Sequence, residues 1–205
     1  MNLLYRCVNV LPWSAKLHKA RRVLVGTMSR APRSASSLDL LRRNLGGSFA
    51  AHARGLLASE FALLNPDGKE FGQLHLGGTP GAELGSGDYA ASFEALGRRY
   101  RMVVDGEEVL SAGLKGRSLD ELEISCGSRI YEARIGFLRN LAVATYQQGG
   151  EAVRLSGGLT GRNYEALFAA EDGCALPVAI FLLWHVAANR RRAYRTVSPT
   201  RGGRM

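Results

Sequence analysis

One segment near the C-terminus restricts the fold of this chain more than any other. Residues 175–188 contain no charged residue, and His185 is the single polar residue among them. A helix of that length spans roughly 20 Å, less than the hydrocarbon core of a bilayer at about 30 Å. A helix that is apolar on all sides belongs in a protein core or in a membrane, and a run of this length is more typical of a core.

The residues on either side of this segment suit the two ends of an α-helix. Two acids precede it and three arginines, residues 190–192, follow it, and both placements are favourable for the helix dipole. Pro177 lies in the first turn, where proline is tolerated. We predict a buried helix over residues 175–192 that places these side chains in the core: Ile180, Phe181, Leu183, Trp184 and His185. The alternative is a tail-anchored membrane protein that uses residues 175–189 as a short transmembrane segment, with the arginines in the cytoplasm.

The sequence before this helix alternates between apolar and polar residues, as β-strands do. In residues 119–126, for example, Leu122, Ile124 and Cys126 fall on one face of a predicted strand. Glycine-containing turns such as Asn-Pro-Asp-Gly at 65–68 separate the predicted strands. Ten to twelve such strands fit into about 115 residues, and their short connections require antiparallel neighbours.

A sheet with this many strands has to protect its edges and its apolar face. Closure into a barrel removes the edges and encloses the apolar face. A barrel of more than about eight strands is too wide to be filled by its own side chains, so another segment must fill it. The fold class predicted is therefore mainly β: a closed antiparallel barrel of about 12 strands around a central hydrophobic C-terminal helix, spanning residues 48–193.

The two ends of the chain differ from this body in charge. Residues 1–43 carry nine Lys or Arg and one acid, and residues 190–205 carry six Arg and no acid, whereas residues 44–189 have a net charge of about −5. A nucleic-acid-binding fold usually carries its positive charge on the folded surface, so we expect no nucleic-acid partner. Basic ends beside an acidic body favour contact with a membrane surface.

We interpret residues 1–36 as a basic, disordered arm and residues 194–205 as a basic, disordered tail. Two starts remain open, because Met28 could be the true first residue in place of Met1. Between the arm and the barrel, residues 37–46 are predicted as a short amphipathic helix that Gly46 ends.

The sequence shows no motif of a known catalytic or cofactor site, and we expect no cofactor, no metal and no catalytic residue. His185 is interpreted as a core histidine bonded to a strand carbonyl. The cysteines lack metal-binding spacing, and Cys126 and Cys174 are interpreted as small buried hydrophobic residues, as in a reducing compartment.

The densest basic cluster of the body is the one candidate binding site, for an anionic lipid or a polyanion: Arg98, Arg99 and Arg101. Strand alternation puts Arg99 and Arg101 on one face and Arg98 on the other. The alternative is that these arginines are solvated strand charges.

These features resemble the tubby C-terminal-like superfamily, which includes LURP-one-related proteins and phospholipid scramblases. The resemblance lies in the Asp-Gly turns at 67–68 and 105–106, in residues 155–173, similar to the family's closing hairpin, and in the helix 175–192. It covers about residues 48–193 and implies a twelve-stranded barrel that encloses a C-terminal helix. It also implies lipid binding through a basic patch, but no acidic calcium loop or palmitoylation-type cysteine run is present, so scramblase activity is not expected.

We therefore expect a non-enzymatic, cytoplasmic barrel that is peripherally attached to membranes. The sequence leaves open whether its partner is an anionic lipid head group, a membrane surface or a protein, and which oligomeric state it adopts. Besides the tail anchor, the alternative is a small enzyme with two carboxylates in a pocket at the barrel mouth, drawn from the strand acids at 107–108 and 120–123.

Overall fold

The computed structural model describes residues 33–55, 58–85, 87–116 and 118–197. The chain divides into two units between residues 31 and 32, and all described residues belong to the second unit. Most of the predicted basic arm, residues 1–32, lies outside the described residues, as does the end of the predicted tail, residues 198–205.

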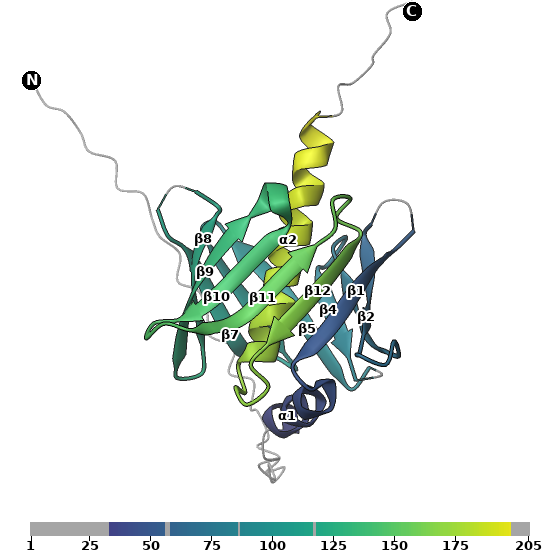
Figure 1. Ribbon diagram of the computed structural model, residues 1–205, viewed down its shortest axis with the longest axis vertical. Helices are drawn as coiled ribbons and strands as arrows, with labels where there is room; N and C mark the ends of the chain where they lie inside the picture. Colours follow the sequence, from purple (N-terminus) through teal and green to yellow (C-terminus); the bar gives the residue numbers. More distant parts are fainter. Residues whose placement is uncertain (1–32, 56–57, 86, 117, 198–205) are drawn as a thin grey trace, which may run out of the picture. The chain divides into compact units, whose positions relative to one another are not determined.

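The described residues form twelve strands that close into an antiparallel barrel (Figure 1). Each strand pairs with its neighbours in sequence, and β1 pairs with β12 to complete the ring. The predicted fold class is thus confirmed. The strands are β1 (Ser48–Arg54), β2 (Glu60–Leu64), β3 (Glu70–His75), β4 (Gly81–Leu84), β5 (Tyr89–Leu96), β6 (Arg99–Val104), β7 (Glu107–Leu114), β8 (Glu121–Cys126), β9 (Arg129–Gly136), β10 (Leu141–Tyr146), β11 (Glu151–Gly157) and β12 (Asn163–Phe168).

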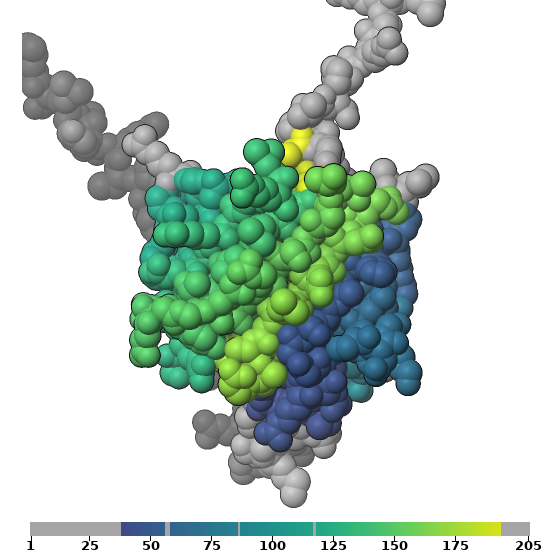
Figure 2. All heavy atoms as spheres, in the orientation of Figure 1, coloured from purple at the N-terminus to yellow at the C-terminus, as the bar shows by residue number. Residues whose placement is uncertain are grey.

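The barrel is filled by the helix α2 (Ala175–Val197), which follows β12 and runs through its interior (Figure 1). Every side chain from residue 175 to residue 187 is buried, including all five predicted core residues. In the space-filling view the helix is hidden behind the strands and emerges at its C-terminal end (Figure 2). Neither described helix combines the length and the apolarity that a span across a membrane requires. The helix also continues five residues beyond its predicted end at residue 192.

The helix α2 lies nearer to one wall of the barrel, and its closest approach is to β11 and β12. Four alanines are buried on this side, at positions 142, 144, 152 and 166, together with the larger Leu155, Tyr164 and Phe168. The opposite wall, from β2 to β6, also buries Ala82 and Ala91, but most of its buried side chains are large: Phe61, Leu63, Leu74, Leu84, Phe93, Tyr100 and Met102.

The N-terminus of α2 is fixed by a buried carboxylate. Asp172 accepts hydrogen bonds from the hydroxyls of Tyr131 (2.7 Å) and Tyr146 (3.0 Å) and forms an ion pair with Arg129 (3.1 Å). Its other oxygen accepts from the backbone N–H of Cys174 at 3.0 Å. A buried carboxylate is stable only with such partners, so this network sets where the helix enters the barrel.

A second helix, α1 (Arg33–Leu45), precedes the barrel and begins four residues before the predicted start at residue 37. It packs through Leu38 and Leu45, which are buried, and Gly46 follows it with φ of +60°, as the predicted left-handed stop requires. A short 3-10 helix, η1 (Phe137–Arg139), joins β9 to β10.

Candidate functional site: the basic mouth of the barrel

Because successive strands run in opposite directions, the connecting loops fall alternately at the two rims. We call the rim where α2 ends the basic mouth; it consists of residues 76–80, 97–98, 115–120, 137–140 and 158–162 together with Arg190, Arg191 and Arg192 of α2. We call the other rim, where α2 begins, the acidic rim; it includes residues 65–69, 85–88, 105–106 and 169–174.

The two rims carry opposite charge. Among the described residues, the loops of the basic mouth contain four basic residues and one acid, Asp120, and α2 adds three arginines. The described loops of the acidic rim contain five acids and one base, Lys69, and α1, which lies at this rim, adds Asp39, Arg42 and Arg43. The barrel surface is therefore polarised along its axis, although the net charge of the body is modest.

The basic mouth also carries the most exposed apolar side chains. Leu138 of η1 is 98% exposed, and Leu159 in the β11–β12 loop is 92% exposed. Leu96 and Leu119 of the same rim are also exposed. Single exposed leucines are common on protein surfaces, but two fully exposed leucines on neighbouring loops, among arginines, are typical of a contact surface.

Arg190 holds these two loops together at the end of the helix. Its guanidinium donates hydrogen bonds to the side-chain oxygen of Asn140, next to η1, and to the backbone oxygen of Leu159. The side chain of Asn140 in turn donates to the backbone oxygen of Gly158. Arg190 is thus a structural residue that links the two loops in which Leu138 and Leu159 lie.

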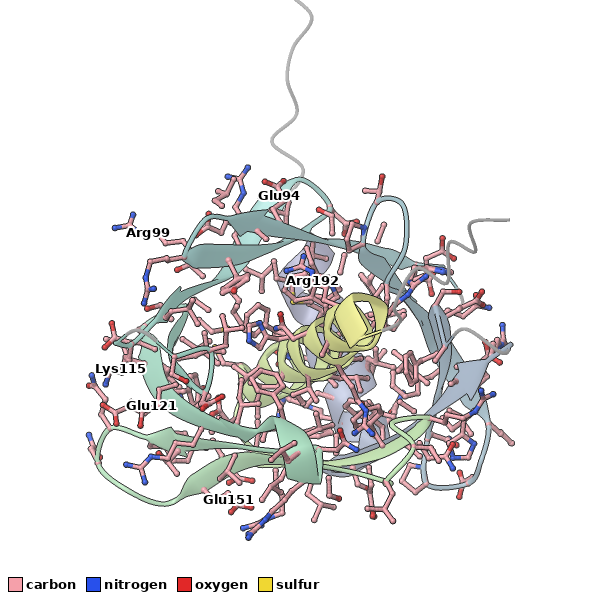
Figure 3. All side chains as sticks on the ribbon, turned by 90° about the horizontal axis from the view of Figure 1, so that it is seen from above. Glu94, Arg99, Lys115, Glu121, Glu151 and Arg192 are labelled. Atoms are coloured by element: carbon pink, nitrogen blue, oxygen red, sulfur yellow. The ribbon has the colours of Figure 1, made fainter. Side chains whose placement is uncertain are left out.

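A pocket of about 290 Å³ opens at the basic mouth between α2 and the β3–β4 loop. Trp184, Arg191 and Arg192 line it from the helix, and Gly77 from the loop. Seen from above, Arg192 lies inside the ring of strands (Figure 3). The guanidinium of Arg191 lies against the β3–β4 loop, 3.4 Å from where a Cβ would stand at Gly77.

Trp184 lines this pocket with a side chain that is itself buried. Its ring stacks on Phe93 of β5, with centroids 4.9 Å apart and planes 10° apart. The indole N–H is buried and has no acceptor among the described residues, which costs about 1–3 kcal/mol. Because this atom has almost no accessible surface, the charged groups that line the pocket are those of Arg191 and Arg192.

His185 lies one position further along α2 and is buried as predicted. Its ring packs edge-on against Tyr100 at 4.9 Å. The predicted bond to a strand carbonyl is not found: neither ring nitrogen has a hydrogen bond of ordinary geometry. Burial lowers the pKa of His185 to about 4, and the backbone of Leu119, in a loop, only partly offsets this effect. The side chain is therefore neutral at physiological pH and contributes to the core.

The predicted arginine cluster does not converge on one site. Arg98 lies in the β5–β6 loop and donates to the backbone oxygen of Gly116. Arg99 and Arg101 point outward from β6, as alternation predicts, and Figure 3 shows Arg99 outside the ring of strands. Arg101 forms an ion pair with Glu94 of β5 at 2.6 Å.

Both strand arginines line a shallow hollow of about 460 Å³ on the outer wall, which also contains Glu108 and Glu123. These acids offset the positive charge, so the hollow is a weaker anion site than the basic mouth. Of the acids proposed for an enzyme, Glu107, Glu108, Glu121 and Glu123 are exposed on the outer wall. Asp120 lies in the β7–β8 loop of the basic mouth and lines, with Glu121 and Arg134, a hollow of about 350 Å³. No group of three or more potential metal ligands occurs within the described ranges.

The basic mouth is not predicted from the sequence. Leu138 and Leu159 each lie in a short turn close to an arginine, but this pattern indicates a surface only when the two loops are known to share a rim. Comparisons with known proteins add no assignment: no protein-family model, no curated protein and no solved structure matches this chain.

Proposed function

We propose that this protein is a non-enzymatic, tubby-like barrel that docks with its basic mouth on an anionic membrane surface. The observation that carries the proposal is the coincidence, on one rim, of the two most exposed leucines, at 98% and 92%, with the arginines of α2. The tubby-like assignment is supported by the barrel with a C-terminal helix inside it, which is the architecture that the resemblance implies.

The forces expected at such an interface are complementary. Each Lys or Arg near an anionic bilayer contributes about 1 kcal/mol, and this attraction falls off within a Debye length. Burial of a leucine side chain contributes about 1.5–3 kcal/mol more. The acidic rim would be repelled, so the charge polarity of the barrel selects one orientation.

In this orientation the Trp184 pocket faces the membrane surface. Arg191, which lines this pocket, can then bind the phosphate or carboxylate of a lipid head group. We propose that the protein acts in this way as a peripheral membrane protein of the cytoplasm. The two described cysteines are free, which is consistent with a reducing compartment.

Vesicle sedimentation of the full chain tests the proposal. We expect binding to phosphatidylcholine vesicles that contain phosphatidylserine, little binding without it, and weaker binding at high salt. The double variant Leu138→Ser/Leu159→Ser should reduce partitioning about tenfold or more, because two apolar anchors are lost.

The matched control is Ile130→Ser/Leu167→Ser, which removes two exposed apolar side chains away from the basic mouth. For charge, Arg191→Gln is compared with Arg154→Gln, because Arg154 pairs with Glu151 on the outer wall. Equal binding by the mouth variants and their controls, or no preference for phosphatidylserine, would exclude docking by this rim.

A further inference from the structure

Two cysteines meet at the acidic rim, at the opposite end of the barrel from the proposed membrane contact. Cys126 ends β8 with its side chain buried, and Cys174 lies directly before α2 and is partly exposed. The Cys174 thiol donates a hydrogen bond to the backbone oxygen of Cys126, with a distance of 3.0 Å from Sγ to O. The two thiols are close enough for each to shift the pKa of the other. The expectation that both are simply buried hydrophobic residues therefore does not describe Cys174.

The surroundings make the two thiols chemically different. The hydrogen bond from Cys126 lowers the pKa of Cys174, and the hydroxyl of Tyr131 and the charge of Arg129 act in the same direction, whereas burial and Asp172 oppose it. The same hydrogen bond and burial raise the pKa of Cys126. Cys174 is thus the one that ionises first, and thiolate character determines the reactivity of a cysteine.

The position of Cys174 at the helix terminus supports the same assignment. Its backbone oxygen accepts the first helical hydrogen bond, from the N–H of Val178 at 3.1 Å, so Cys174 is the N-cap of α2. Helix N-termini stabilise negative charge, thiolates included. The neighbouring Gly127 has no side chain to separate the two cysteines, and a Cβ there would lie 3.7 Å from the Cys174 sulfur.

We propose that Cys126 and Cys174 form a peroxide-sensitive dithiol, in which Cys174 is the attacking cysteine and Cys126 the resolving cysteine. The Cys174 thiolate attacks a hydroperoxide, the O–O bond breaks, and the leaving alkoxide or hydroxide takes up a proton, which leaves a sulfenic acid on Cys174. The Cys126 thiol then loses its proton and attacks that sulfur, and the hydroxyl leaves as water. In balance, two thiols and one hydroperoxide give one disulfide, one alcohol or water molecule, and one further water molecule.

The disulfide would connect the N-cap of α2 to the wall of the barrel, 48 positions away in sequence. It closes a long loop of the unfolded chain, so oxidation should raise the unfolding temperature. Because this pair lies at the acidic rim, the inference is independent of membrane docking, and either can fail without the other.

The test uses the full chain, treated with hydrogen peroxide and mapped by mass spectrometry of non-reduced peptides. We expect an intramolecular Cys126–Cys174 disulfide that a dithiol reductant reverses, and an unfolding temperature that rises with its formation. In the reduced protein, alkylation of Cys174 should be about tenfold or more faster than that of Cys126.

Two variants separate the roles of the cysteines. Cys126→Ala keeps a small apolar side chain, and it should leave Cys174 as a sulfenic acid that dimedone traps; Cys174→Ser should leave Cys126 unmodified at the same dose. Three results would each overturn the proposal. The first is oxidation of Cys126 before Cys174, and the second is a disulfide formed only with Cys7 or between molecules. The third is the absence of any disulfide in a protein that stays folded by circular dichroism.

Discussion

Acidification should destabilise the barrel through one buried side chain, His185. In the folded chain its ring is 1% exposed and is surrounded by the rings of Tyr100, Phe137, Phe181 and Trp184. A proton on the ring would place a charge in this apolar site, and the nearby charge of Arg192 opposes protonation further.

The size of the effect follows from the two pKa values. The pKa of the histidine is about 6.5 in the unfolded chain and about 4 in the folded chain. Between these values the unfolded state binds a proton that the folded state excludes, so the free energy of unfolding falls as the pH falls. The contribution is fully present above pH 6.5 and is lost progressively towards pH 4, and it amounts to about 3 kcal/mol.

The measurement is urea unfolding, monitored by circular dichroism, of the wild type and of His185→Met from pH 7 to pH 4. Methionine fills a similar volume and does not titrate, so the carboxylates contribute equally to both curves. The free energy of unfolding of the wild type relative to the variant should fall by about 3 kcal/mol across this range. Parallel curves for the two proteins would refute the reasoning, because they would mean that the ring reaches solvent or a hydrogen-bond partner when it is charged.

Three further substitutions test other parts of the fold by the same unfolding measurement. Asp172→Asn removes the charge that accepts hydrogen bonds from Tyr131 and Tyr146 and should lower the free energy of unfolding by about 2–4 kcal/mol. The control Asp88→Asn, in an exposed loop, should lower it by less than about 0.5 kcal/mol. Equal losses would contradict the role of Asp172 in fixing the helix. Phe181→Ala in the plug should cost about 3–5 kcal/mol, and a loss below about 1 would show that the helix does not fill the barrel. Gly72→Ala should lower the free energy of unfolding by about 2 kcal/mol or more, because the new Cβ would clash with the backbone oxygen of Glu83. The control Gly113→Ala, where the new Cβ meets open space, should be nearly neutral. A larger loss for Gly113→Ala than for Gly72→Ala would refute the close approach of β3 to β4.

The parts of the fold that the sequence predicts are those where one local pattern decides the structure. The strands β7 and β11 have the bounds that alternation and turn residues indicate, and the turn at Asp105-Gly106 has positive φ at both residues. The strands β1 and β4 were not identified. The first is rich in alanine, with Phe49 as its one aromatic residue, and the second has only four residues, none of them β-branched or aromatic, so both lack most of the residues by which strands are recognised.

The candidate sites depend on which loops and strands the closed ring brings together. Local density singled out Arg98, Arg99 and Arg101, but the charge of that surface depends on acids that lie on neighbouring strands, such as Glu94. Likewise, Cys126 and Cys174 are 48 positions apart, and they meet because α2 starts beneath the end of β8. Such neighbours follow from register and closure, which the local sequence does not encode.

The order of the elements along the chain has a consequence for biosynthesis. All twelve strands are translated before the helix that occupies their interior, and about 130 residues separate the first strand from that helix. At 5–20 residues per second, the ribosome needs roughly ten seconds to cover this distance, during which the inward faces of the sheet have nothing to pack against. The nascent chain therefore depends on chaperones or on delayed closure, and ribosomes that stall before α2 should release aggregation-prone products.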